Sequence, residues 1–169
     1  MNAYDMLLTR KSVRAYTGQH VSDELVEKVM LAGTRAPSGL ANEPWRFAVI
    51  RDPGVKGQIA ELTKYTRVLN DSDVLICLFM DNSVGYNATK DANTIGACAE
   101  NMLLAAHSLG LGAVWIAEIL KNKEQVTQLC GVDPVRYDLM VVIPLGYSAE
   151  NADPNPRKHT VADCVISRK

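Results

Sequence analysis

The sequence predicts helices layered around a β-sheet, in the α/β or α+β class. Helix-like and strand-like segments alternate through the middle of the chain, which is typical of layered folds. The apolar run at 74–80 does not alternate with polar residues, which indicates a strand buried on both faces. The length of 169 residues fits one domain. This pattern leaves the direction of the strands open.

Caps, turn signals and periodicity locate the elements in order. Ser22 is placed to cap a helix whose apolar face ends before Pro37. Aromatic and β-branched residues predict a strand at 45–50. The other expected elements are a short helix at 55–65, a strand at 74–80, a long apolar helix at 91–109 that Gly110 ends, a strand at 112–119, a helix at 123–130 capped by Asn122, and a strand at 139–146 in which Pro144 indicates an edge or a bulge.

Composition excludes several classes of protein. Eighteen Lys and Arg stand against nineteen Asp and Glu, so no global basic field favours nucleic acid or an anionic membrane. The four cysteines lie far apart without zinc-ligand spacing, so neither a disulfide scaffold nor structural zinc is expected. The N-terminus lacks a signal-peptide pattern, and no apolar run approaches the ~20 residues that span a bilayer. We expect a cytoplasmic protein.

Three polar clusters are candidates for chemistry. Residues 10–14 (Arg-Lys-Ser-Val-Arg) place three cations and a hydroxyl within five positions, and such groups are typical phosphate ligands. Residues 36–45 form a loop with Pro, Gly and hydrogen-bonding side chains. Residues 156–158 (Pro-Arg-Lys) form a second basic group near the C-terminus. Each cluster, taken alone, also fits a solvated surface.

Familiar catalytic motifs are missing from the sequence. It has no dinucleotide-binding glycine turn, no Walker loop and no nucleophile elbow. Its three histidines, His20, His107 and His159, have no metal-ligand spacing. A cofactor that carries the chemistry itself would leave only binding residues in the sequence, and this fits what is seen.

In order and spacing, these clusters resemble the nitroreductase family of FMN-dependent oxidoreductases. Residues 10–14 are similar to the family's basic opening, and residues 37–45 to its Pro-Ser-x-x-Asn-x-Gln-Pro-Trp loop. Residues 96–116 resemble its central helix followed by Gly-Leu-Gly and a Trp-bearing strand, and residues 156–158 its C-terminal phosphate-binding segment. The resemblance covers essentially the whole chain.

The resemblance implies an α+β fold, a three-layer sandwich in which helices flank a mainly antiparallel central sheet. It implies one FMN-binding domain over residues 1–169, with an extended C-terminal arm at about 150–169. It also implies an intertwined homodimer that holds two FMN molecules at its interface.

The resemblance further implies roles for individual residues. Arg14 would lie near the flavin N1/O2 edge, where a cation stabilises reduced flavin. The backbone at Ala117 and Glu118 would face the flavin N5. The other implied contacts are to the phosphate from Arg10, Lys11 and Ser12 with Arg157 and Lys158 of the tail, to the pyrimidine edge from Arg67, and to the ring from Pro37, Ser38 and Gly39 of the partner subunit.

Two positions depart from the family pattern. Ala41 stands where the family usually has Asn, and Glu43 where it usually has Gln. A shift of one residue would let Asn42 substitute, whereas Glu43 adds negative charge near an anionic cofactor. Residues 81–94 are the one sizeable loop available as a lid, so we expect an open, permissive pocket.

The activity implied is a ping-pong hydride transfer. NADH or NADPH would reduce flavin N5 and leave, and a small-molecule acceptor such as a nitroaromatic or quinone would then be reduced. No side chain is expected to be catalytic, because flavin N5 carries the chemistry. The alternatives are a specialised flavin reaction such as dehalogenation or dehydrogenation, a non-catalytic FMN-binding module, and a cofactor-free interaction domain.

Overall fold

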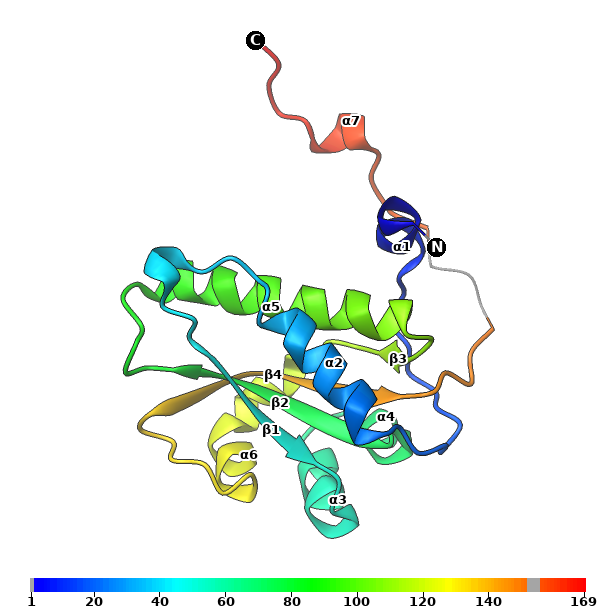
Figure 1. Cartoon of the computed structure of the whole chain (residues 1–169), viewed down its shortest axis with the longest axis vertical. Helices are drawn as coiled ribbons and strands as arrows, with labels where there is room; N and C mark the ends of the chain where they lie inside the picture. Colours follow the sequence, from blue (N-terminus) through cyan, green and yellow to red (C-terminus); the bar gives the residue numbers. More distant parts are fainter. Residues whose placement is uncertain (1, 152–155) are drawn as a thin grey trace.

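The computed structural model describes residues 2–151 and 156–169, and its helices surround one four-stranded sheet (Figure 1). The elements in chain order are α1 (Ala3–Thr9), α2 (Asp23–Gly33), η1 (Gly39–Ala41), β1 (Trp45–Ile50), α3 (Pro53–Glu61), α4 (Thr66–Asp71), β2 (Val74–Asp81), α5 (Ala88–Ser108), β3 (Gly112–Ala113), η2 (Glu118–Asn122), α6 (Lys123–Leu129), β4 (Tyr137–Gly146) and α7 (Val161–Cys164).

The strand order is β1-β2-β4-β3, and every pair of neighbours is antiparallel. Helices α2 and α5 cover one face of the sheet, and α3, α4 and α6 lie on the other (Figure 1). The α+β fold class and the flanked antiparallel sheet are therefore confirmed. The question of strand direction, which the hydropathy pattern left open, is settled by the pairing.

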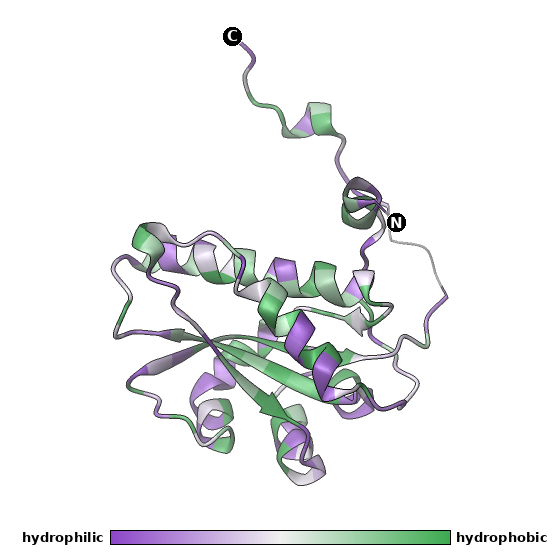
Figure 2. Ribbon diagram, viewed as in Figure 1, coloured by the Kyte–Doolittle hydropathy of each residue, from purple (hydrophilic) through white to green (hydrophobic). Residues whose placement is uncertain are grey.

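Strand β2 is buried on both faces, as its apolar run predicted. Val74, Ile76 and Leu78 belong to the core under α2 and α5, whereas the alternate residues belong to the core on the other side. Hydrophobic colour fills the central strands in Figure 2. A bulge in β4 at the level of Leu78 shifts the register by one residue, so that both Met140 and Val141 face the α5 side.

Helix α5 is the central helix of its layer. Ile95, Cys98, Met102 and Ala106 are buried on the side that faces the sheet. Gly110 follows the helix with a φ of 75°, the left-handed geometry expected of a C-terminal glycine. The helix begins at Ala88, before the predicted start at residue 91, because the Asn87 side chain caps it.

The predicted strand at 112–119 is wrong beyond its first two residues. β3 ends at Ala113, and after it a single bridge joins Ile116 to Val142 of β4. Pro144 of β4 stands between these two pairings, and it has no N–H to donate toward β3. Its carbonyl accepts the Tyr16 hydroxyl at 3.2 Å instead. Pro144 therefore interrupts a ladder inside the sheet, and β4 is not an edge strand.

Other boundaries also differ from the prediction. The helix expected at 55–65 is found as α3, which begins at Pro53 and ends at Glu61, whereas α1 and α4 were not expected. Asn122 precedes α6 but makes no cap hydrogen bond, and its amide is oriented by the bond from Nδ2 to the Leu62 carbonyl at 2.7 Å.

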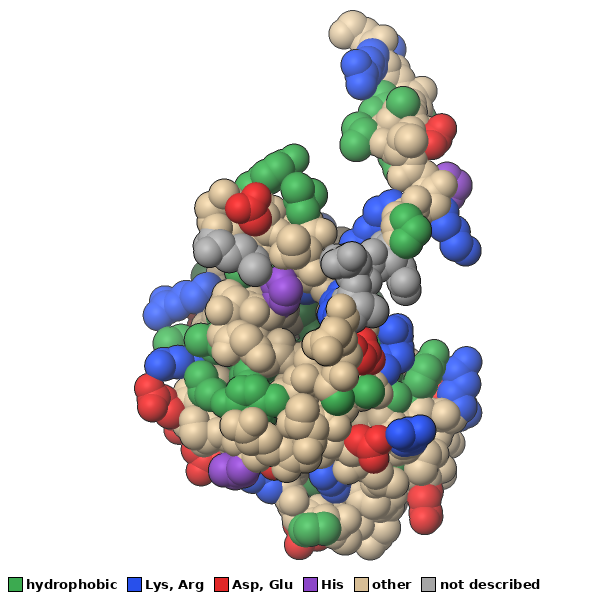
Figure 3. All heavy atoms as spheres, turned by 90° about the vertical axis from the view of Figure 1, so that its right-hand side faces the viewer, with side chains coloured by type: hydrophobic (Ala, Val, Ile, Leu, Met, Phe, Trp, Pro, Cys, Tyr) green, Lys and Arg blue, Asp and Glu red, His purple; other side chains and the backbone are tan. Residues whose placement is uncertain are grey.

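The tail at 156–169 projects away from the sheet and its helices (Figure 1). Its side chains are exposed, among them Val161 and Ile166. Figure 3 shows the face at this end of the molecule, where Lys and Arg are interspersed with Asp and Glu. No helix among the described residues combines the length and apolarity needed to cross a membrane.

Candidate functional site

The basic segment 10–14 lies beside β3. The Val13 N–H donates to the Ala113 carbonyl at 3.0 Å, and the Val13 side chain packs on Gly112, where a Cβ would stand 2.6 Å away. From β3 the chain passes through the half-exposed Trp115 to Ala117. Two segments far apart in the sequence, both predicted to bind the cofactor, are thus brought together.

Arg10 and Arg14 retain donors for an anion. Arg10 pairs through its Nε with Glu100 on α5 at 3.3 Å, and its side chain is largely buried. Arg14 is exposed, and its NH1 lies 3.4 Å from the Ser12 carbonyl. Within the described chain the other guanidinium nitrogens of both residues make no hydrogen bond or ion pair. Each arginine can therefore present a fork of N–H groups to phosphate or to a carbonyl oxygen.

Lys11 faces a separate cavity of about 200 Å³, which it lines together with His107 and Glu150. Its Nζ lies 3.4 Å from the Glu150 carbonyl. The His107 ring contacts Thr9 (Nε2 to Oγ1, 2.9 Å), and burial, together with the charges of Arg10 and Lys11, lowers the pKa of His107. This side of the segment therefore joins α1 to α5.

The η1 loop (residues 37–43) borders a second cavity, of about 380 Å³. Pro37, Ser38 and Gly39 line it on one side, and Tyr86 and Lys90 on another. A Cβ on Gly39 would stand 1.8 Å from the Tyr86 hydroxyl oxygen, so the tyrosine lies directly against the glycine. The loop that was predicted as a lid at 81–94 is shorter than expected, because α5 already begins at residue 88.

The η1 loop also holds three non-glycine residues in left-handed backbone conformations. The φ angles are 56° at Leu40, 53° at Ala41 and 42° at Glu43. Such conformations cost on the order of 1–3 kcal/mol each, and they occur where the surroundings hold them in place. The Glu43 side chain is exposed, and its N–H lies 3.4 Å from the Ser38 hydroxyl.

Asn42 is tied into the protein through its amide. Its Nδ2 donates to Asp91 Oδ1 at 2.9 Å and to the Val84 carbonyl at 3.2 Å. Its Oδ1 is buried and has no hydrogen-bond partner among the described residues. One end of this side chain thus anchors the loop, and the other end remains an acceptor that a ligand or a partner chain can satisfy.

The turn at Ala117 and Glu118 is held by the Glu118 carboxylate. Its Oε2 accepts the Thr63 hydroxyl at 2.5 Å and the Lys64 N–H at 3.3 Å, and its Oε1 pairs with Lys121 at 2.5 Å. Hydrogen bonds from Lys121 and Thr63 lower the pKa of Glu118 to about 2. Ala117 is exposed, and as η2 begins at Glu118, the first N–H groups of this turn are not used by its own helical bonds. The side chain fixes the turn while the backbone remains available.

Arg67 and the tail cations are not brought to the basic segment. Arg67 lies on α4 with its side chain 91% exposed, in an ion pair with Asp71 at 3.1 Å. It follows Thr63, whose hydroxyl donates to Glu118, by four residues. Arg157 and Lys158 are exposed on the tail, and within the described residues no hydrogen bond or ion pair joins them to residues 10–14.

The η1 loop and the basic segment contact different halves of α5 (Figure 1). Lys90 and Asn93 of its first turns face the η1 loop, whereas Glu100 and His107 face residues 9–11. Lys90 and Glu100 are ten residues apart, which is about 15 Å along the helix at ~1.5 Å per residue. Within one chain, the η1 loop and Arg10 therefore contact different turns of α5.

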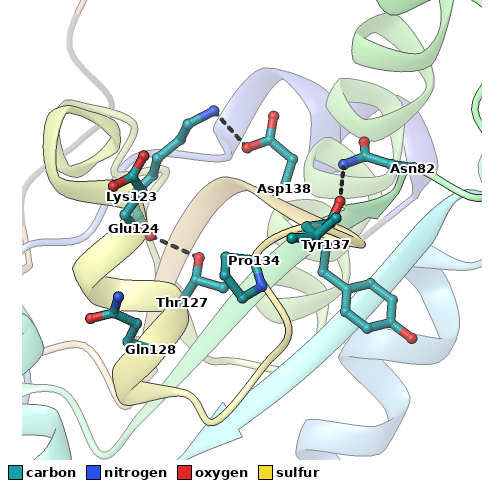
Figure 4. A pocket seen from close by; sticks show the side chains of 9 residues that line it. Asn82, Lys123, Glu124, Thr127, Gln128, Pro134, Tyr137 and Asp138 are labelled. Carbon is teal, nitrogen blue, oxygen red and sulfur yellow. Dashed lines mark hydrogen bonds and ion pairs between the residues drawn. The ribbon is translucent and has the colours of Figure 1, made fainter.

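A larger cavity, of about 490 Å³, lies between α6 and the start of β4 (Figure 4). Three of its polar side chains bond to neighbouring groups: Lys123 to Asp138 at 2.7 Å, Thr127 to the Lys123 carbonyl, and Asn82 to the Val135 carbonyl. None of the predicted cofactor residues lines it.

Comparison with known proteins identifies the family. The model of the nitroreductase family matches residues 7–69 and 60–147. The chain belongs to the nitroreductase family. Among the relatives of this nitroreductase-family chain is a protein of Methanothermobacter thermautotrophicus, provisionally named an NADH dehydrogenase/NAD(P)H nitroreductase, with 34% identity over 89% of this chain and 80% of that protein.

Two further relatives differ in what they are named for. A nitroreductase structure from Desulfovibrio desulfuricans, solved in complex with FMN, superposes with a TM-score of 0.94 at 36% identity and covers 100% of this chain and 98% of that one. Iodotyrosine deiodinase 1 of Mus musculus is 40% identical over 96% of this chain and 68% of its own length. The family therefore includes relatives named for different reactions.

Sequence reasoning missed several residues that shape this nitroreductase-family site. Asp91 was treated only as the start of a helix, and Tyr86 only as part of a loop. The ion pair of Glu100 with Arg10 was not expected, and Glu118 was expected to contribute its backbone only, not a carboxylate that binds Thr63. A single sequence gives no signal for such tertiary pairs, although an acidic residue in the first turn of a helix is a known preference.

Proposed function

We propose that this chain is an FMN-dependent oxidoreductase that uses NADH or NADPH to reduce small-molecule acceptors such as nitroaromatics or quinones by a ping-pong mechanism. The observation that carries the proposal is the contact of segment 10–14 with β3, which joins the basic segment to the turn at Ala117. Family membership and the FMN complex of a relative at 36% identity support it. When bound, FMN would supply the hydride-carrying ring.

The residues present fit such a cofactor. Arg10 and Ser12 would hold the phosphate, and the exposed Arg14 would place a fixed positive charge beside the ring, where it stabilises negative charge. The N–H groups of the Ala117 turn would donate to the ring edge. The unpartnered Oδ1 of Asn42 offers a buried acceptor in the η1 loop. These groups would orient FMN and stabilise its negative charge, and none of them needs to exchange a proton with substrate.

We also propose that the working form is a cytoplasmic homodimer with one domain per chain. The separation of Gly39 from Arg10 along α5 supports a site shared between subunits. Arg67, Arg157 and Lys158 keep their proposed cofactor roles, with Arg157 and Lys158 reaching the phosphate through the projecting tail. Lys11 would reach the phosphate by turning out of its cavity.

Visible absorbance tests this proposal. The purified protein, incubated with FMN and desalted, should stay yellow and should bleach when NADH or NADPH is added without oxygen. Arg10→Ala should retain at least about tenfold less FMN, since a charged phosphate contact is lost. Arg14→Ala should keep FMN but slow bleaching by about 10²-fold, as expected for loss of one charge-stabilising donor. Normal flavin content and bleaching in both variants would refute these roles, and colour that never bleaches would favour a binding module.

Reductive dehalogenation is a second candidate, favoured by the 40% identity to an iodotyrosine deiodinase. The FMN contacts would be the same, and the cavity at Gly39 and Tyr86 would select a halogenated phenol. Iodide release from iodophenol by the reduced protein, measured beside the reduction of a nitroaromatic, separates the two. Faster turnover of the iodophenol would replace the first acceptor class with the second.

A further inference from the structure

The buried carboxylate of Asp91 holds two loops that border the cavity at Gly39. Its Oδ2 accepts the backbone N–H groups of Tyr86 and Asn87, each at 2.9 Å, and its Oδ1 accepts the Asn42 amide at 2.9 Å. Asp91 is 1% exposed. Burial raises its pKa, but the hydrogen bonds outweigh burial and keep the pKa below its usual value. The group is therefore ionised at neutral pH, with both oxygens occupied.

The first of these loops is the η1 loop, which is strained. Leu40, Ala41 and Glu43 all have positive φ, a conformation that side chains disfavour. Asn42 stands among the three, and its amide reaches out of the loop to Asp91 and to Val84. The contact with Asp91 is thus placed to hold the strained segment in one conformation.

The second loop is the Tyr86 loop (residues 82–87), which carries the tyrosine to Gly39. The hydroxyl would overlap any side chain at residue 39, yet Tyr86 is 41% exposed. Lys90 lies over the ring, with Nζ 5.6 Å from its centroid. Because Tyr86 and the glycine line the same cavity, the position of the ring sets how much room is left there.

We propose that Asp91 is a positioning residue that couples the Tyr86 loop to the η1 loop and thereby limits the size of the acceptor admitted beside Gly39. Since one carboxylate serves both loops, displacement of either loop weakens the contacts of the other. The statement about acceptors rests on the proposed function. The coupling itself is a property of the chain without cofactor.

Amide hydrogen exchange of the protein tests the coupling. Asn42→Ala removes one partner of Asp91, together with the direct bond to the Val84 carbonyl, and leaves the donors at Tyr86 and Asn87 intact. We expect exchange at those two amides to become about tenfold faster, because loss of one hydrogen bond to a charged group loosens the shared acceptor. Asp91→Asn keeps the Val84 bond, so faster exchange at the two amides in that variant as well assigns the coupling to Asp91. The matched control is Asp133→Asn, which removes a carboxylate that accepts the Val135 N–H in another loop and should leave both amides unchanged. Unchanged exchange at both amides in Asn42→Ala would overturn the coupling, whatever the activity.

Acceptor size tests the consequence. With the FMN-loaded protein, kcat/KM is measured for nitrobenzene and for the three-ring anthraquinone-2-sulfonate. Tyr86→Ala and Asn42→Ala should both raise the ratio for the larger acceptor over the smaller, by about tenfold for a pocket enlarged by several carbons. A constant ratio in Tyr86→Ala would refute the size limit. If the wild-type protein reduces neither compound, the proposed function fails, and the exchange experiment still decides the coupling. Should Asp91→Asn fold, both readouts should change together in that variant.

Discussion

Two glycines in helices differ in whether neighbouring side chains leave room for a Cβ. Gly33, at the end of α2, faces α5 so closely that a Cβ would lie 2.7 Å from Met102 Cγ and 3.0 Å from Cys98 Sγ. At Gly57, inside α3, a Cβ would meet no atom within 4 Å beyond its chain neighbours and the backbone of its own helix. Both glycines lie in helices, yet only the first is required by packing.

This contrast gives a matched pair of variants. Gly33→Ala should destabilise the protein by about 1–3 kcal/mol, because it inserts a methyl group into a packed contact. Gly57→Ala should stabilise it by about 0.5–1 kcal/mol, because alanine loses less backbone entropy in a helix. Urea unfolding followed by circular dichroism measures both. Equal effects of the two substitutions would show that helix propensity, and not the approach of α2 to α5, dominates at Gly33.

At the scale of elements, Asp81 joins three strands' ends. It is 0% exposed at the end of β2, and it pairs with Arg46 of β1 and with Arg136 just before β4, each at 3.0 Å. Ser83 donates to it from the Tyr86 loop, through its hydroxyl at 2.6 Å. The Arg136 guanidinium, against the effect of burial, holds the pKa of Asp81 well below its usual range. This carboxylate fixes the point at which the Tyr86 loop leaves the sheet.

Removal of this charge should be costly, and the cost should depend on pH. Asp81→Asn should destabilise the protein at pH 7 by about 1.5–3 kcal/mol, the range for hydrogen bonds to a charged group. A depressed pKa contributes stability above the unfolded value of about 3.9, and this contribution is lost as pH falls toward the folded value. The difference in the free energy of unfolding between wild type and Asp81→Asn should therefore become smaller from pH 5 to pH 3, as measured by urea unfolding. Glu24→Gln, in an exposed pair with Lys28, is the control and should change the free energy of unfolding much less than Asp81→Asn does. If the difference in the free energy of unfolding between wild type and Asp81→Asn stayed constant from pH 5 to pH 3, the ionised carboxylate would not be the source of the stability.

The elements that sequence could predict are those whose signals are local. Strand 45–50 and the capped helix after Ser22 depend on nearby residues, and both were found. Helix α4 was missed because its cap position is Tyr65, which makes no side-chain cap hydrogen bond. The early end of β3 depends on Pro144, a residue in another strand. In the candidate site, too, the sequence indicated which residue types could bind a cofactor. The hydrogen bonds that join Asp91 to the η1 loop and to the Tyr86 loop could not be predicted, because they depend on tertiary structure.

At the scale of the whole molecule, most of the predicted cofactor residues lie in two groups, which we propose to be two half-sites. Segment 10–14 and the Ala117 turn lie at the β3 side, and the η1 loop lies beside the first turns of α5 (Figure 1). Each chain would supply one half-site of each kind. If two chains met with their α5 helices in opposite directions, the basic segment of one would join the η1 loop of the other, and the dimer would have two complete sites. The exposed apolar residues of α1 and of the tail, such as Leu8 and Ile166, would then be covered.

A mixture of two defective chains tests this arrangement. We expect light scattering of the protein at micromolar concentration to give about twice the chain mass of 18.5 kDa. Arg10→Ala damages one half-site and Gly39→Val the other, so each homodimer should bind FMN poorly. In a mixed dimer the intact Arg10 of one chain meets the intact Gly39 of the other, which restores one of its two sites. Random co-refolding should therefore recover about a quarter of the wild-type FMN capacity, measured by quenching of flavin fluorescence. If each site were built from a single chain, the mixture would bind no more FMN than the average of the two variants.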